Sequence, residues 1–316
     1  MKILVVGAGA IGGYYGSRLI AAGADVTFLV RAKRAALLAE RGLNVHSQLG
    51  NFAGPVHTIL QESLASGYDL VLLSCKTYDL EAAINDIAPA MSGTAVMLPF
   101  LNGLSAYDRL DARFGRDRVL GGVAYIATML DRDGAIQHLG TSDMVQVGSR
   151  TPAGAALAGE FHGLLARSPG VRLLSDDIGH ALWSKWVMLA SGALMTCLMR
   201  GPVGAILASK DGMSLMKQAI AECGSVAEAE GYALDTTDQQ RIESLLLDRE
   251  SPWAASMARD IAQNAPRIEA DAIVGDMVLR AERHALHAPL VRTAYCHLQV
   301  YEHERQKALT RADHQD

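Results

Sequence analysis

Cysteine is scarce in this chain. The sequence contains no Cys-x-x-Cys pair and no group of cysteine and histidine at zinc-site spacing. We therefore predict that no metal is bound and that the thiols are reduced and buried. The cysteines are Cys75, Cys197, Cys223 and Cys296.

The chain also lacks a large excess of charge of either sign. Its 29 Lys and Arg against 34 Asp and Glu leave a net charge of -5, and the basic residues are scattered. Because nucleic-acid binding needs a basic face or stripe, we exclude a nucleic-acid partner. A hydrophobic content of 50% and a charged content of 20% are typical of soluble globular proteins, and 316 residues predict two domains.

Membrane and secretion signals are sparse. Lys2 is followed at once by a strand-like run, without the pattern of a secretory signal. One apolar segment, residues 181–199, approaches the length of a membrane span, but it is solitary and contains Lys185. A fully buried helix of a large soluble domain has the same composition. We predict a cytoplasmic protein without a membrane partner.

The first part of the chain alternates strand-like and helix-like segments. The strand candidates are short apolar runs, which suit strands buried on both faces of a parallel sheet. They cover residues 2–6, 25–30, 70–74, 94–98 and 119–123, and segments with a helical pattern lie at residues 10–22, 32–41, 79–87 and 104–114. This alternation predicts an α/β domain with a doubly wound, mainly parallel sheet.

The later part changes character. Residues 125–148 are strand-like without intervening helices, which favours an antiparallel extension. Helical periods then follow at residues 178–199, 213–231, 237–247, 268–285 and 290–308. We predict an α/β domain over residues 1–174 and an all-α domain over residues 175–316, whose apolar helices are compatible with a homodimer.

A glycine loop, Gly7-Ala8-Gly9-Ala10-Ile11-Gly12, follows the first strand and opens the first helix. In a Rossmann fold the first glycine permits the tight turn, the second admits a pyrophosphate, and the third lets helix and strand pack closely. The helix N-terminus adds N–H groups and the positive end of its dipole. We predict that Gly7, Gly9, Ala10, Ile11 and Gly12 bind a dinucleotide.

The end of the second strand carries a cation. An NAD site usually has Asp or Glu about 20 residues after the glycine loop, whereas this sequence has Arg31, followed by Lys33 and Arg34. A planar guanidinium suits the 2′-phosphate of NADP, so the sequence predicts NADPH as cofactor, with Arg31 as its ligand. The alternative is a set of solvated charges at the head of a surface helix.

With these segments in view, the chain resembles the ketopantoate reductases (2-dehydropantoate 2-reductases), which reduce a 2-keto acid with NADPH. The resemblance spans nearly the whole chain and implies a Rossmann domain and a helical C-terminal domain of the 6-phosphogluconate dehydrogenase kind. It rests on GAGAIGGYYGSRLIAAGADVTFLVR at the start, SCKTYD around Lys76, LPFLNG around Asn102, the segment around Lys185, and SMARDIAQNAPRIEADAIVG at residues 256–275.

Lys185 is the candidate general acid. It is the only residue with a basic or acidic side chain between His180 and Arg200. A buried ammonium lowers its pKa or finds a partner, which suits a proton donor, although a lysine at a helix edge can instead reach solvent. The resemblance implies that Lys185 protonates the carbonyl oxygen as hydride arrives. It also implies that Glu269 contacts the substrate hydroxyl and orients the lysine; by composition alone, Glu269 would complement a helix dipole.

Three further residues are candidate ligands. Asn102 follows a strand end, which favours a ligand role over that of a turn residue. Lys76 also follows a strand end, where taken alone it is as often a solvated loop lysine. Ser256 taken alone is as often a helix cap. The resemblance implies that Asn102 lies beside the nicotinamide and the reacting carbonyl, that Lys76 lies at the cofactor and substrate, and that Ser256 binds the substrate carboxylate.

The sequence departs from the family four and eight residues after Lys185. Asparagines are common there in the family, and this chain has Leu189 and Ala193. Apolar side chains on that helix face favour a less polar substrate tail. The predicted substrate is a small 2-keto acid, and ketopantoate is the first candidate among such acids. The alternatives are a bulkier apolar 2-keto or 2-hydroxy acid, and a non-catalytic NADP sensor.

Overall fold

The computed structural model describes residues 1–313; residues 314–316, the end of the predicted second domain, lie outside the described part. The chain divides into two compact units. One comprises Met1–Leu101 and Ala106–Leu182, and the other comprises Asn102–Ser105 and the chain from Trp183 onward. Residues 175–182, which we assigned to the helical domain, thus group with the α/β unit. The division into a cofactor domain and a substrate domain at residue 175 stays a prediction.

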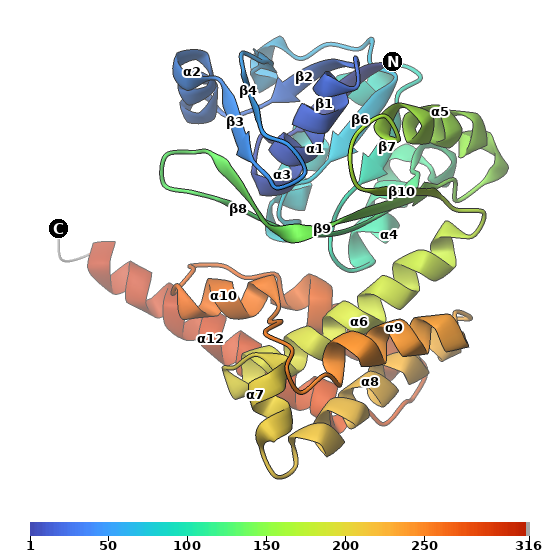
Figure 1. Ribbon diagram of the computed structural model, residues 1–316, viewed down its shortest axis with the longest axis vertical. Coiled ribbons are helices and arrows are strands. Elements are labelled where there is room, and N and C mark those ends of the chain that lie inside the picture. Colours follow the sequence, from blue (N-terminus) through green and yellow to red (C-terminus); the bar gives the residue numbers. More distant parts are fainter. Residues whose placement is uncertain (314–316) are drawn as a thin grey trace. The chain divides into compact units, whose positions relative to one another are not determined.

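A parallel sheet forms the centre of the α/β unit (Figure 1). Its strand order is β5-β2-β1-β6-β7, and every neighbouring pair in it is parallel. The strands are β1 (Lys2–Val6), β2 (Asp25–Leu29), β5 (His57–Ile59), β6 (Leu70–Leu73) and β7 (Val96–Pro99). The helices between them along the chain are α1 (Ala10–Ala21), α2 (Ala32–Arg41) and α3 (Leu80–Asp86), and α4 (Ser105–Phe114) follows β7. This arrangement confirms the predicted doubly wound α/β fold.

A second sheet has the order β10-β9-β3-β4, with β8 paired to β9. The chain from residue 119 to 123 was wrongly predicted as a strand of the parallel sheet. Only Val119 bridges to Met97 in parallel, and β8 then pairs antiparallel with β9. A short apolar run indicates a strand without naming its partner. The strands are β3 (Leu43–His46), β4 (Phe52–Gly54), β8 (Gly121–Leu130), β9 (Ile136–Gly148) and β10 (Val171–Leu174), and α5 (Ala155–Leu165) contacts β9 and β10.

A buried charge holds helix α1 against this second sheet. The carboxylate of Asp143 accepts hydrogen bonds from the hydroxyls of Tyr14 and Tyr15 at 2.9 and 3.0 Å. It also pairs with Arg172 at 2.6 Å, and both charged side chains are almost fully buried. Removing one member of such a pair typically costs about 3–5 kcal/mol, because the other is left buried and unpaired. The orientation of α1 is therefore strongly specified.

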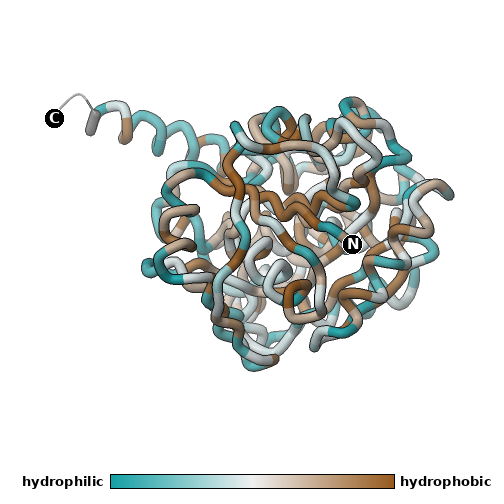
Figure 2. Tube along the Cα trace, turned by 90° about the horizontal axis from the view of Figure 1, so that it is seen from above, coloured by the Kyte–Doolittle hydropathy of each residue, from teal (hydrophilic) through white to brown (hydrophobic). Residues whose placement is uncertain are grey.

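The second unit is helical, as predicted. The apolar helix α6 (Ile178–Met199) belongs to this unit from Trp183 onward, and it has a mean hydropathy of 1.3 over its most apolar window, 83% of which is buried. That burial is the behaviour of a core helix. The remaining helices are α7 (Val203–Ala208), α8 (Gly212–Ala229), α9 (Thr236–Leu246), α10 (Ser256–Ala262), α11 (Asp276–Arg283) and α12 (Pro289–Asp313). In Figure 2 the last turns of α12 are mostly hydrophilic, whereas the strands beside the N-terminus are hydrophobic.

The predicted continuous helix at residues 268–285 differs from the structure. A π-helical turn, Asp271–Gly275, precedes α11, and within it the N–H of Asp276 donates to the carbonyl of Asp271. Such turns insert one residue into an α-helix and often mark functional sites. The 3.6-residue period of the sequence does not reveal this insertion.

The cysteines are free, as predicted, but their burial varies. Cys197 and Cys223 are buried, Cys75 is half-buried and Cys296 is exposed. Burial raises the pKa of both Cys197 and Cys223 to about 12. These two thiols therefore stay protonated at neutral pH, whereas the expected burial was wrong for Cys75 and Cys296.

Candidate functional site

The glycine loop lies at the point where the parallel sheet reverses its strand order. β1 has β2 on one side and β6 on the other, so the loop leaves β1 at the switch point of the sheet. Gly7 has a φ of +91°, a conformation that favours glycine. Gly9 is the N-cap of α1, with no side-chain cap hydrogen bond, and the first turn of α1 contains no acidic residue. The helix terminus is thus electrostatically suited to an anion.

The second and third glycines of the loop serve different needs. A Cβ atom on Gly12 would overlap the carbonyl oxygen of Gly7 and the hydroxyl of Ser74. A Cβ on Gly9 would meet no atom within 4 Å. Gly12 is therefore required by the packing of α1 against the sheet, whereas Gly9 leaves open space beside the helix N-terminus. This open space fits the pyrophosphate of a dinucleotide.

Arg31 and Lys76 lie at the carboxyl ends of β2 and β6. Arg31 is the N-cap of α2, its side chain is 83% exposed, and it pairs with Asp79 at 3.5 Å. Lys76 is exposed and precedes the short helix Thr77–Asp79. An ion pair with so exposed a partner contributes little to stability, typically ~0–1 kcal/mol. Breaking the pair with Asp79 so that Arg31 can bind a ligand therefore costs little free energy.

Arg34 makes the direct contact with the glycine loop. Its Nε donates to the carbonyl of Ala8 at 3.0 Å, and its Nη1 donates to the carbonyl of Gly134 at 2.9 Å. The guanidinium thus ties α2 and the β8–β9 turn to the loop. Sequence reasoning placed Arg34 only among the cations near Arg31, because no local pattern predicts a contact with Gly134.

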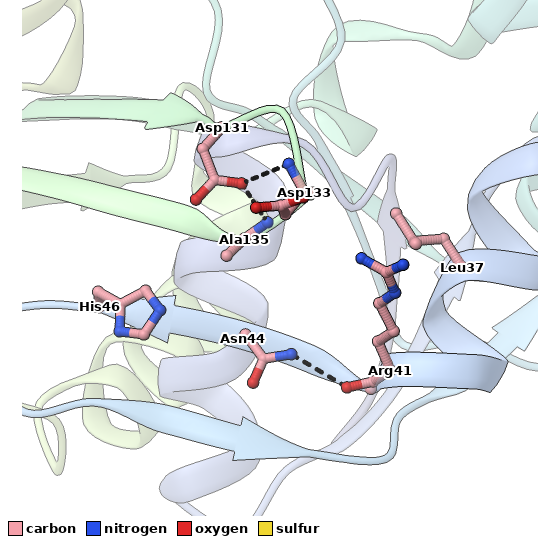
Figure 3. Close-up of a pocket in the computed structure, with 9 residues that line it drawn as sticks. Leu37, Arg41, Asn44, His46, Asp131, Asp133 and Ala135 are labelled. Carbon is pink, nitrogen blue, oxygen red and sulfur yellow. Dashed lines mark hydrogen bonds between the residues drawn. The ribbon is translucent and has the colours of Figure 1, made fainter.

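A polar cavity of about 240 Å³ lies beside this turn (Figure 3). Asp131 accepts hydrogen bonds there from the N–H groups of Asp133 and Ala135, as the dashed lines show. The Asp131 carboxylate thereby organises the turn. None of the predicted site residues lines this cavity, which is formed by Leu37, Arg41, Gly42, Asn44, His46, Asp131, Asp133, Gly134 and Ala135.

In the helical unit, the structure brings Asn102, Lys185 and Glu269 together. The Nζ of Lys185, on α6, donates to the Oδ1 of Asn102 at 3.5 Å. Burial lowers the pKa of Lys185 to about 8, and the negative charge of Glu269 acts in the opposite direction. Glu269 is only 6% exposed. The arrangement is a desolvated ammonium beside a buried carboxylate, which is suited to giving up a proton near neutral pH.

Ser256 lies close to a later part of α6. It is the first residue of α10, and the cap residue is Ala255, so the alternative role of Ser256 as an N-cap is wrong. The N–H of Ala255 donates to the hydroxyl of Thr196 at 3.4 Å. This bond anchors the start of α10 to α6, further along the helix than Lys185.

The two positions that depart from the family are both buried. Leu189 is 8% exposed and Ala193 is fully buried. Apolar side chains therefore continue along α6 beyond Lys185, and no amide stands at either position to hydrogen-bond a ligand.

Comparison with known proteins identifies the family. The family model "Ketopantoate reductase PanE/ApbA" matches residues 3–151, and the model of its C-terminal part matches residues 177–302. A Bacillus subtilis protein described as "Uncharacterized oxidoreductase YkpB" is 35% identical over 96% of this chain and 100% of its own length.

Two solved structures are similar over nearly the full chain. A 2-dehydropantoate 2-reductase from Geobacter metallireducens is 28% identical, with a TM-score of 0.85, covering 95% of this chain and 99% of its own. A D-mandelate dehydrogenase, solved with NADH and anilino(oxo)acetate, is 21% identical, with a TM-score of 0.87, and the match covers 97% of this chain and 100% of that one.

Together, the parallel-sheet unit, the helical unit and these matches define an oxidoreductase that acts on a CH–OH group. The chain belongs to the ketopantoate reductase family.

The two glycines can be separated by substitution. We expect Gly12→Ala to lower the free energy of unfolding by about 1–3 kcal/mol, because the added methyl group overpacks the contact between α1 and β1. Gly9→Ala should leave the thermal midpoint nearly unchanged. Thermal unfolding followed by circular dichroism measures both effects, and equal midpoints for the two variants would contradict this assignment.

Proposed function

We propose that this protein reduces a small 2-keto acid with NADPH, with Lys185 as the general acid and ketopantoate as the leading substrate. The observation that carries the proposal is the position of the Lys185 ammonium, hydrogen-bonded to Asn102 and acted on by the charge of Glu269. Membership of the ketopantoate reductase family supports the same reaction class.

The proposed cofactor site comprises the glycine loop, Arg31, Lys76 and Asn102. Gly7, Gly9, Ala10, Ile11 and Gly12 present the N-terminus of α1 to the pyrophosphate, and Gly9 leaves the space for it. The NADH in the mandelate dehydrogenase structure supports a nicotinamide cofactor. The exposed guanidinium of Arg31, standing where NAD sites carry an acid, favours the 2′-phosphate of NADPH.

The chain's own contribution to the chemistry is a proton held ready at Nζ of Lys185. When bound, the nicotinamide supplies the hydride. A pKa of about 8 keeps Lys185 protonated at neutral pH, yet makes it a stronger acid than an ordinary lysine. Glu269 keeps the pKa from falling further, and Asn102 accepts a hydrogen bond that orients the ammonium. The developing alkoxide of the substrate would receive this proton.

Ser256 and Lys76 complete the proposal as substrate ligands. Both side chains are donors suited to a carboxylate: Lys76 is an exposed cation and Ser256 a half-exposed hydroxyl. Family membership supports these roles, and Glu269 is proposed to contact the substrate hydroxyl. A homodimer and a cytoplasmic location stay predictions.

A second candidate substrate is a bulkier, apolar 2-keto acid. Leu189 and Ala193 stand where asparagines are common in the family, so two hydrogen-bonding side chains are absent from α6 beyond Lys185. Compared with a helix that carries these asparagines, α6 should discriminate less against a substrate with an apolar tail. The similarity to a D-mandelate dehydrogenase, whose structure holds anilino(oxo)acetate, supports this alternative.

The function is tested by following NADPH absorbance with ketopantoate and a graded series of 2-keto acids that ends in phenylglyoxylate. We expect oxidation with at least one of them. Lys185→Ala should lower kcat about 10²–10⁴-fold, because the proton donor is lost, while the NADPH dissociation constant stays nearly unchanged. Lys217→Ala, at an exposed lysine on α8, is the control. No turnover with any acid would instead support a non-catalytic NADP-binding protein.

The lowered pKa of Lys185 predicts the pH dependence. The acid form is needed for reduction, so kcat/KM should be level below about pH 8 and fall up to tenfold per pH unit above it. Initial rates measured between about pH 6 and pH 10 test this expectation. A plateau that continues through pH 10, the range of an ordinary lysine, would rule out the depressed pKa.

Cofactor choice is tested at Arg31. Arg31→Asp should shift the ratio of kcat/KM for NADPH to that for NADH about 10- to 100-fold toward NADH, since a charged hydrogen bond to phosphate is worth ~1.5–3 kcal/mol. Arg41→Asp makes the same charge change at the far end of α2 and should leave the ratio unaltered. If both variants shift the ratio equally, Arg31 is not the phosphate ligand.

A further inference from the structure

Two contacts of the helical unit meet at adjacent residues of the π-helical turn. The backbone of Gly103, at a φ of +78°, lies so close to Ala272 that a Cβ atom would overlap the Ala272 carbonyl oxygen. At the next residue, the carbonyl of Ile273 accepts a hydrogen bond from the indole Nε1 of Trp186 at 3.0 Å.

Each contact adjoins a residue of the proposed active site. Gly103 follows Asn102, and Trp186 follows Lys185. The N–H of Ile273 donates to the carbonyl of Glu269 at 3.1 Å, so the backbone of Glu269 is bonded directly to the residue that Trp186 contacts. The pair Ala272–Ile273 is therefore a common junction for the loop of Asn102, the helix of Lys185 and the backbone of Glu269.

The indole N–H is the specific link at this junction. Trp186 is 1% exposed, so its N–H has no access to water. A buried donor or acceptor left without a partner is destabilising, so the bond to Ile273 strongly favours one alignment of α6 on the π turn. Packing of a large apolar ring permits small displacements of the helix, whereas a hydrogen bond fixes the distance and angle between its donor and acceptor.

We propose that Trp186 is a positioning residue: its indole N–H aligns α6 on the π turn and so holds Lys185 beside Glu269 and Asn102. This inference rests on the proposed function for its catalytic meaning. The geometry on which it depends lies within the helical unit and is testable without substrate or cofactor.

Trp183 provides a matched control on the same helix. Its ring lies 5.0 Å from that of Trp186, and the Arg280 guanidinium lies 5.3 Å from the Trp183 ring and 5.5 Å from the Trp186 ring. Trp183 also stacks on Tyr232 at 5.6 Å. Substituting Phe at either position removes the same atoms from one aromatic cluster, but only Trp186→Phe removes the bond to Ile273.

The test measures the pKa of Lys185 directly. Each protein, free of ligands, is treated with a trace of acetic anhydride across a pH series, and acetylation of Lys185 is quantified by mass spectrometry. In Trp186→Phe we expect the pKa to rise from about 8 by up to ~1 unit, because burial is the larger influence on Lys185 and ~1 kcal/mol corresponds to somewhat less than one unit. Trp183→Phe should stay at about 8.

The outcomes separate this inference from the proposed function. An unchanged Lys185 pKa in folded Trp186→Phe would overturn the positioning role even if the protein reduces a keto acid. A raised pKa in Trp186→Phe alone, with no keto acid reduced by the unaltered protein, would retain the positioning role and overturn the function. If Trp186→Phe fails to fold, Gly103→Ala tests the same junction from the other side: a raised pKa is expected, and an unaltered one refutes the role.

Discussion

The interaction on which the candidate site depends is the contact of a half-buried ammonium, that of Lys185, with Asn102 and the charge of Glu269. On α6 itself, the four residues on either side of Lys185 include no acidic side chain. The partners come from elsewhere: Asn102 from the end of β7, and Glu269 from the segment before the π turn. Burial and the carboxylate oppose one another, and their balance leaves a proton that is both present and transferable near neutral pH.

A different constraint governs the α/β unit, namely the close approach of α1 to β1. Gly12 permits that approach, and the buried carboxylate of Asp143 further fixes α1 through its hydrogen bonds with Tyr14 and Tyr15. The N-terminus of α1 is thus presented at the switch point of the sheet with little freedom to move. Rigid presentation lowers the entropic cost of binding a dinucleotide.

Much of the fold, and the residues of the candidate site, could be inferred from local patterns in the sequence. The glycine loop has a fixed spacing between strand and helix, and the isolated charge of Lys185 stands out in an apolar helix. Three features were not predictable in the same way. Residues 119–123 joined a hairpin instead of the parallel sheet, the helix before α11 contained a π turn, and Arg34 reached across to the β8–β9 turn. The strand pairing and the Arg34 contact depend on partners distant in sequence, and the residue period does not reveal the π turn.

By itself, the sequence indicated the alternation of strands and helices in the first part of the chain, the glycine loop between β1 and α1, and Lys185 as an isolated charge in an apolar helix. These features depend on periodicity, spacing and residue type within a few turns of chain. Only the tertiary structure decided which strand β8 pairs with, that Trp186 bonds to Ile273, and that Lys185 meets Asn102 and Glu269. The lowered pKa belongs to this second group, since desolvation and Coulomb interactions depend on distance in space and not on distance along the chain.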